Sequence, residues 1–295
     1  MKVAAGSCDS RRNDFDAEVE NRFMPSQIRF GYADFLENHA YPAFLEFWEV
    51  GTRLLDALNA FTLNVGKPEE THPRIVRNLC LITGMSFSDV ALLVGNGCGI
   101  SAMKITRTAL ESAINAEYLR LNPSELKDFI DWSAVEQYRR LVYVRKYLPG
   151  AVTSLNPQFI ADTDKNYKAV RPYFLSRQGT MRLTWCKSNL RLRAEKAGFL
   201  KIYDDVYTST SALSHGSLGG LAQHVETLVG DNWQPAMPPS MTLCAEALSA
   251  AHYCAFRAFQ TLAELNELGS VPAVRDLKND YNHAWSRVPS AQKIR

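Results

Sequence analysis

The chain has 295 residues, of which 46% are hydrophobic, and its formal net charge is +2. This is the composition of an ordinary soluble globular protein with enough apolar side chains for a sizeable core. The six cysteines include no CxxC pair, and the opening residues, MKVAAGSC, lack the apolar region of a signal peptide. We therefore expect a reduced, cytoplasmic protein and not a secreted disulfide framework.

A membrane span needs about 18 uncharged apolar residues in a row, and we find no such stretch. The longest candidate is residues 245–265, which contain Glu246, His252, Arg257 and Glu264. We expect no membrane among the partners of this protein.

The small net charge conceals a strong separation of charge along the chain. Residues 139–201 contain 14 Lys and Arg against three Asp and Glu, a net charge of +11. Residues 1–138 carry −6 and residues 202–295 carry −3. The basic segment also contains several Tyr, Phe and Trp, a mixture suited to phosphate contact and base stacking. Two interpretations remain open: a solvated face that docks on the acidic remainder, and a surface for RNA, DNA or another anionic partner.

Apolar residues recur at helical spacing along most of the chain, and few stretches alternate as strands do. In chain order the pattern predicts helices over residues 41–63, 74–95, 101–119, 124–147, 183–197, 203–213, 241–268 and 274–285. Residues 151–182, rich in Asn, Asp, Lys and Tyr, are expected to be a partly irregular insertion. The predicted fold is all-α, a bundle of about seven to nine helices with a basic insertion.

This pattern divides the chain into three parts. Residues 1–40 are expected to be an N-terminal extension, residues 41–269 a single helical domain, and residues 270–295 a short helix and tail. Within the domain, Gly95, Gly97 and Gly99 of VGNGCGIS predict a tight turn. A phosphate-cradling loop is the alternative, but no strand precedes these glycines and no Lys-Ser/Thr pair follows them.

Residues 101–119 are the most informative helix, because charge falls among its apolar residues. Arg107 lies one turn after Met103 of the apolar ridge, and Glu111 lies one turn after Arg107. This spacing lets the two side chains form an ion pair. A charged pair in a core needs further polar partners, and the richest supply is the run YTSTSALSHGS at residues 207–217.

His215 is the best single candidate for chemistry. Helical spacing places Tyr207, Ser211, Ser214 and His215 on one face, where hydroxyls, or Glu111 from a neighbouring helix, could fix the imidazole tautomer. One interpretation is a histidine held in a buried hydrogen-bond network. The other is a site in which His215, Arg107 and Glu111 are catalytic.

The helix over residues 124–147 supplies further polar candidates. Its inner stripe includes Glu136 and Arg139, which we expect to be a second buried polar pair. The predicted ligand-binding residues are Tyr118, Glu136, Arg139, Tyr207, Ser211 and Ser214.

Two familiar catalytic templates lack required residues. A di-iron site built from Glu111, Glu117, Glu136 and His215 would need ExxH pairs that are absent, and Arg107 would oppose a cation. A Ser-His-acid triad would need Ser211 or Ser214 beside His215, but neighbouring helical residues diverge by roughly 100° and no GxSxG elbow occurs. We expect no metal and no cofactor.

The run ALLVGNGCGISAMKITRTALESAINAEYL, with DWSAVEQYRRL and the later YDDVYTSTSALSHGS, resembles the bacterial family known as domain of unknown function 5677. The resemblance covers residues 74–225 and implies an all-helical domain in which polar groups converge. The positions that it implies are Gly97, Arg107, Glu111, Tyr118, Tyr207, Ser211 and His215. It implies a fold and a site, but no activity.

Three functions remain compatible with these residues. The first is a binding or regulatory module whose basic segment, residues 139–201, contacts RNA, DNA or an acidic partner, with a homo-oligomer also open. The second is a metal-independent endoribonuclease, used in phage defence or stress, that is similar in outline to HEPN-type ribonucleases. That family carries Arg four to six residues before His, whereas the nearest Arg before His215 is Arg193. The third is an enzyme or sensor for a small anionic ligand.

Overall fold

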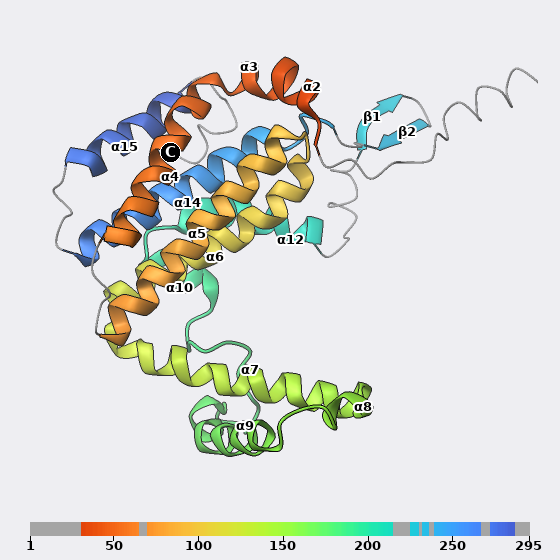
Figure 1. Cartoon of the computed structure of the whole chain (residues 1–295), viewed down its shortest axis with the longest axis vertical. Helices are drawn as coiled ribbons and strands as arrows, with labels where there is room; N and C mark the ends of the chain where they lie inside the picture. Colours follow the sequence, from red (N-terminus) through yellow and green to blue (C-terminus); the bar gives the residue numbers. More distant parts are fainter. Residues whose placement is uncertain are drawn as a thin grey trace, which may run out of the picture.

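The computed structural model describes residues 31–64, 70–214, 225–229, 232–235, 239–266 and 272–286. The longer helices are α4 (Leu45–Asn64), α5 (Thr71–Gly95), α6 (Gly99–Leu121), α7 (Leu126–Tyr147), α9 (Pro157–Val170), α10 (Leu190–Lys196), α12 (Thr208–Ser214), α14 (Cys244–Leu265) and α15 (Pro272–Ala284). The short ones are α2 (Ala33–Phe35), α3 (Tyr41–Ala43), α8 (Pro149–Val152), α11 (Leu200–Ile202), the π-helices η1 (Leu36–Ala40) and η4 (Tyr203–Tyr207), and the 3₁₀ turns η2 (Pro123–Glu125) and η3 (Arg171–Phe174). Strands β1 (Val225–Val229) and β2 (Asn232–Pro235) pair antiparallel, with an irregular register between Val225 and Thr227. The prediction of an all-α fold is confirmed (Figure 1).

Helix α6 packs against both α5 and α14, which also pack against each other (Figure 1). Small residues line this contact and let the helix axes come close. On α6 these are Ala102, Ala109, Ala113 and Ala116, and on α14 they are Ala247, Ala250, Ala251, Ala255 and Ala258, all buried. Helices α4 and α15 cover the other side of α14, and α15 contributes Leu277 and Tyr281 to the same core. The bundle therefore includes helices that come before and after residues 74–225 in the chain.

Helix α5 is the described helix that is long and apolar enough, by length and composition, to span a membrane. Half of its apolar window is buried inside the structure, where it packs against α6 and α14. The core helix of a soluble protein has the same composition. The expectation that residues 245–265 are the most span-like segment was therefore wrong.

Helices α7, α8 and α9 with the turn η3, residues 126–174, form an arm that projects from the bundle (Figure 1). Within the arm, α9 packs on α7, and the Tyr138 and Tyr167 rings stack with centroids 3.7 Å apart. The expected irregular insertion is thus largely helical. Asn156 explains the start of α9, because its side chain accepts a hydrogen bond from the Gln158 amide at 2.8 Å.

The segment between the arm and α10 is less helical than its sequence pattern predicts. Helix α10 begins only at Leu190, where Asn189 caps it by accepting from the Leu192 amide at 2.9 Å. Before it, the Cys186 thiol accepts from the Ser188 amide at 3.3 Å, which fixes a non-helical turn. This turn lets residues 181–189 run from the arm back to the bundle.

The glycine-rich turn between α5 and α6 is a site of close backbone packing. Gly97 has a φ of +66°, and its carbonyl accepts from the Ser240 amide at 3.0 Å. A Cβ on Gly99 would lie 2.1 Å from the Thr242 carbonyl oxygen and 2.7 Å from the Cys244 amide nitrogen. These glycines therefore seat the start of α14 against the start of α6, as a tight turn and not as a phosphate cradle.

His252 is enclosed by aromatic rings in the core of α14. Its Nδ1 accepts a hydrogen bond from the Trp285 indole at 3.0 Å, which places the imidazole proton on Nε2. The Phe47, Phe87 and Tyr281 rings lie 5.1 to 5.6 Å from it, centroid to centroid. Burial lowers the pKa of His252 to about 3, so the folded protein holds it neutral.

We expect Gly99→Ala to lower the free energy of unfolding by about 3 kcal/mol, because the new methyl group meets two backbone groups that cannot move separately. Urea unfolding followed by circular dichroism measures this. Gly150→Ala is the matched control, since a Cβ there meets nothing within 4 Å. Equal stability of the two variants would contradict the close approach.

We expect acid to destabilise the protein through His252. Its pKa of about 3 in the folded state lies below the value of about 6.5 in an unfolded chain, so the unfolded state binds the proton first. Stability is complete above pH 6.5 and falls as the pH drops toward 3, by about 2 kcal/mol at pH 5 from this residue. Urea unfolding at pH 7.5 and pH 5 should show a loss about 2 kcal/mol smaller in His252→Gln, and an equal loss in both proteins would refute it.

Candidate functional site

One polar face of α6 lies against α10 and the π-helix η4. Arg107, Glu111 and Asn115 follow one another at intervals of four residues, and each is only partly buried. The facing elements contribute Arg193 from α10 and Tyr207 from η4. We call these five residues the α6 seam.

The predicted pair of Arg107 and Glu111 is present. Nε of Arg107 donates to Oε1 of Glu111 at 2.8 Å, and Nη2 donates to the Tyr207 hydroxyl at 2.7 Å. The expectation that residues 207–217 supply a partner is therefore confirmed. The expectation of full burial was wrong, because the two side chains are 25% and 39% exposed. Arg107 lies beside the apolar ridge of α6, and its long stem carries the guanidinium to the edge of the core.

Burial alone would lower the pKa of Arg107, but its bond to Glu111 and its proximity to Tyr207 raise that pKa above the ordinary value. The guanidinium also lies over the Tyr207 ring, 4.3 Å from the centroid. Tyr203, one turn earlier, stacks on Tyr207 with the ring centroids 4.6 Å apart. The π-helical turn thus presents two stacked phenols to Arg107.

The remaining residues predicted on this face are only partly described. Ser211 lies on α12 and is half-buried. His215 and the side chain of Ser214 lie outside the described residues. The proposed catalytic role of His215, and with it the ribonuclease interpretation, stays a prediction.

Sequence reasoning missed Arg193, although it is the most deeply buried charge of the seam. Its side chain is 5% exposed, its Nη1 donates to Oδ1 of Asn115, and its guanidinium lies 4.8 Å from the Trp185 ring centroid. No described carboxylate lies within ion-pair distance, and Nε has no described partner. Burial lowers the pKa of Arg193 accordingly. The nearest signal in the sequence was the basic run LRLR at residues 190–193, which begins five residues after Trp185.

Tyr118 lies further along α6 and faces a different neighbour. Its ring is buried, and its hydroxyl lies 3.7 Å from the Cys186 sulfur. Burial and this thiol raise the pKa of Tyr118 to about 12, so the phenol stays protonated at neutral pH. It packs on Trp185 edge to face, with centroids 6.0 Å apart. Tyr118 thus packs against Trp185, the same ring that lies over the Arg193 guanidinium.

The expected buried pair of Glu136 and Arg139 was wrong. Both residues are exposed on the arm. Glu136 accepts from the Trp132 indole at 3.2 Å, and Arg139 donates to the Arg182 carbonyl at 3.0 Å. The stripe that they share faces solvent because α7 leaves the bundle (Figure 1).

A second polar network, which the sequence did not indicate, joins α6 to α14. Arg120 makes two hydrogen bonds of 2.8 Å to the buried Glu117 and an ion pair of 2.6 Å with Glu264. Thr261 donates to the same Glu117 carboxylate at 3.0 Å. Both carboxylate oxygens of Glu117 thus accept hydrogen bonds from protein side chains. Among the described residues, no group of three or more His, Cys, Asp or Glu is placed to hold a metal ion.

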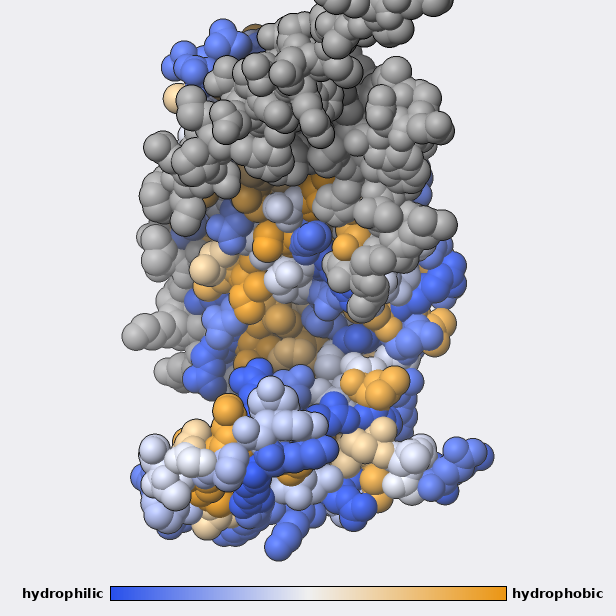
Figure 2. All heavy atoms as spheres, turned by 90° about the vertical axis from the view of Figure 1, so that its right-hand side faces the viewer, coloured by the Kyte–Doolittle hydropathy of each residue, from blue (hydrophilic) through white to orange (hydrophobic). Residues whose placement is uncertain are grey.

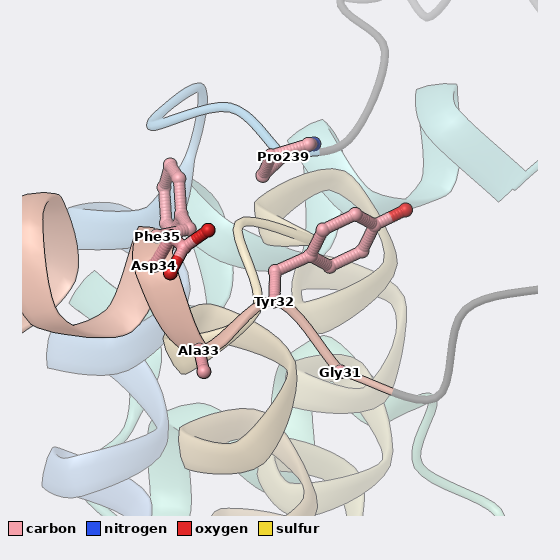
Figure 3. Close-up of a pocket in the computed structure, with 6 residues that line it drawn as sticks. All are labelled: Gly31, Tyr32, Ala33, Asp34, Phe35 and Pro239. Carbon is pink, nitrogen blue, oxygen red and sulfur yellow. The ribbon is translucent and has the colours of Figure 1, made fainter.

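A small cavity lies elsewhere, at the end of the bundle where the glycine-rich turn meets the N-terminal helices (Figure 3). It has a volume of about 240 Å³ and is lined by Gly31, Tyr32, Ala33, Asp34, Phe35 and Pro239. Nearby, the Tyr32 amide donates to Oδ1 of Asn96 at 2.7 Å. No predicted site residue lines this cavity.

The comparison with known proteins agrees with the resemblance in the sequence. No curated protein and no solved structure matches the chain. The model of a family of unknown function, DUF5677, matches residues 74–232, which include most of α5, the helices from α6 to α12 and the whole described seam. Because this match covers more than half of the chain, the protein is a member of the DUF5677 family.

Proposed function

We propose that this protein is a nucleic-acid-binding module and that the arm, residues 126–174, binds a single strand of RNA or DNA. The observation that carries the proposal is a stripe of alternating cations and aromatic rings on the exposed face of α7. Arg140, Tyr143, Lys146 and Tyr147 follow one another at intervals of one turn or less, and all are exposed.

The two tyrosines of this stripe are free to receive bases. Their side chains are 58% and 57% exposed, and their ring centroids lie 4.9 Å apart. Exposed rings of this kind stack on nucleobases with little dependence on sequence. The Lys146 ammonium lies 4.9 Å from the Tyr147 centroid, so charge and ring occupy one surface.

The charge of the arm supports the same partner. Residues 139–174 contain seven Lys and Arg against two Asp. Asp164 pairs with Arg145 at 2.8 Å, whereas Arg140, Lys146, Lys165, Lys168 and Arg171 have no described carboxylate within ion-pair distance. In Figure 2 the lower part of the molecule is a mosaic of strongly hydrophilic residues and paler or apolar ones. Unneutralised cations beside exposed rings favour a nucleic acid over an acidic protein, which would not use the rings for stacking.

We expect the double variant Tyr143→Ala/Tyr147→Ala to bind a single-stranded oligonucleotide of about 20 nucleotides at least about tenfold more weakly, because each lost stack is worth about 1–3 kcal/mol. Fluorescence anisotropy with a labelled uridine strand measures this. Tyr41→Ala is the matched control, since Tyr41 is an exposed tyrosine of the bundle. An equal loss in the control, or no binding by the wild type at low salt, would refute the proposal.

We also expect binding to weaken steeply between about 50 and 200 mM salt, because phosphate contacts release counterions. In Arg140→Gln/Lys146→Gln the slope of log affinity against log salt should fall by about 0.7 for each cation removed. Arg53→Gln, which removes an exposed cation of the bundle, should leave the slope unchanged. A slope that is equally steep in all three proteins would show that the arm does not contact phosphate.

A further inference from the structure

We propose that the α6 seam binds a phosphate group, on a surface separate from the arm and independently of the function proposed for it. The ligand is a phosphate monoester, a phosphodiester or free phosphate, and the recognising groups are Arg107, Asn115 and Tyr207, with Arg193 beneath them.

The seam has more hydrogen-bond donors than acceptors. Nη1 of Arg107 has no described partner, and the Tyr207 hydroxyl, which accepts from Nη2, keeps its own proton to donate. Against these donors the seam offers one carboxylate, Glu111. A ligand rich in acceptors completes such a set, and guanidinium groups match phosphate with paired bonds.

Arg193 orients the Asn115 amide so that its nitrogen is a further donor of the seam. Because Oδ1 of Asn115 accepts from Nη1 of Arg193, the amide group is held with its Nδ2 turned elsewhere, and no described residue accepts from Nδ2. Asn115 itself is only partly buried.

Arg193 also supplies a charge with which no described carboxylate forms an ion pair. Its side chain is 95% buried, its Nε has no described partner, and the described residues give it no ion pair. A buried cation without a counter-ion is costly, and it raises the affinity of its surroundings for an anion. The described charges of the seam are two guanidinium groups and one carboxylate.

Glu111 occupies the position beside Arg107 that we assign to the phosphate. It is 39% exposed and paired to Arg107 at a spacing of four residues, an arrangement that stabilises a helix surface only weakly. A phosphate carries more charge and more acceptor atoms, so it displaces this carboxylate from Arg107. Glu111 then swings into solvent, which its exposure allows.

Two isosteric variants test the site with inorganic phosphate as the probe, measured by calorimetry and by phosphorus NMR at fixed ionic strength. Glu111→Gln removes the competing charge, and we expect it to bind phosphate about threefold more tightly or better. Asn115→Asp gives Arg193 a counter-ion and removes the donor, so we expect a higher melting temperature together with at least about a tenfold loss of phosphate affinity. Arg145→Gln, on the arm, is the control and leaves phosphate binding unchanged.

A competition experiment distinguishes the sources of phosphate. A short oligonucleotide with a 5′-phosphate and the same strand with a 5′-hydroxyl are titrated against bound inorganic phosphate in the Tyr143→Ala/Tyr147→Ala background. Displacement by the first alone identifies a monoester, displacement by both a diester, and displacement by neither free phosphate.

The proposal is overturned if Glu111→Gln fails to tighten phosphate binding, or if Asn115→Asp raises the melting temperature without weakening that binding. It is also overturned if neither the wild type nor Glu111→Gln binds phosphate. None of these results bears on the arm, whose test uses a different ligand surface and other variants.

Discussion

The rest of the structure depends on the burial of α6. Packed against α5 and α14 through small residues, this helix buries 13 of its 23 residues. Every polar group on its buried face must then find a partner in the protein or reach the edge of the core. Glu117 finds Arg120 and Thr261. Arg107 reaches the edge and meets Tyr207. These two polar networks are consequences of burying one face of a helix that carries charged residues.

The sequence predicted those features that depend on local spacing. The helical period fixed the all-α fold, and an interval of four residues was enough to pair Arg107 with Glu111. The prediction that residues 207–217 supply a partner was also correct, through Tyr207. A partly buried charge needs polar partners, and this run is the part of the sequence richest in them. The glycine-rich turn was predicted for a related reason, since positive φ at Gly97 is a local requirement.

The sequence failed where the outcome depends on how distant segments are placed. Periodicity gave α7 an inner stripe, but the stripe has no bundle to face once α7 projects, so Glu136 and Arg139 are exposed. Arg193 was missed for the opposite reason. Residues 181–189 do not continue a helix but return to the bundle, and this path carries an ordinary surface residue type into the core beside Asn115. No local pattern encodes that return.

Trp185 connects the arm to the α6 seam. The Trp185 ring packs edge to face on Phe129 of the arm, 5.1 Å between centroids, and on Tyr118 of α6. The same ring lies against the Arg193 guanidinium. A desolvated cation against an indole gains about 2 kcal/mol, so the ring partly replaces the counter-ion that Arg193 lacks. The packing of Trp185 therefore both anchors the arm and holds the buried charge of Arg193 in the α6 seam. A change at Trp185 would disturb both.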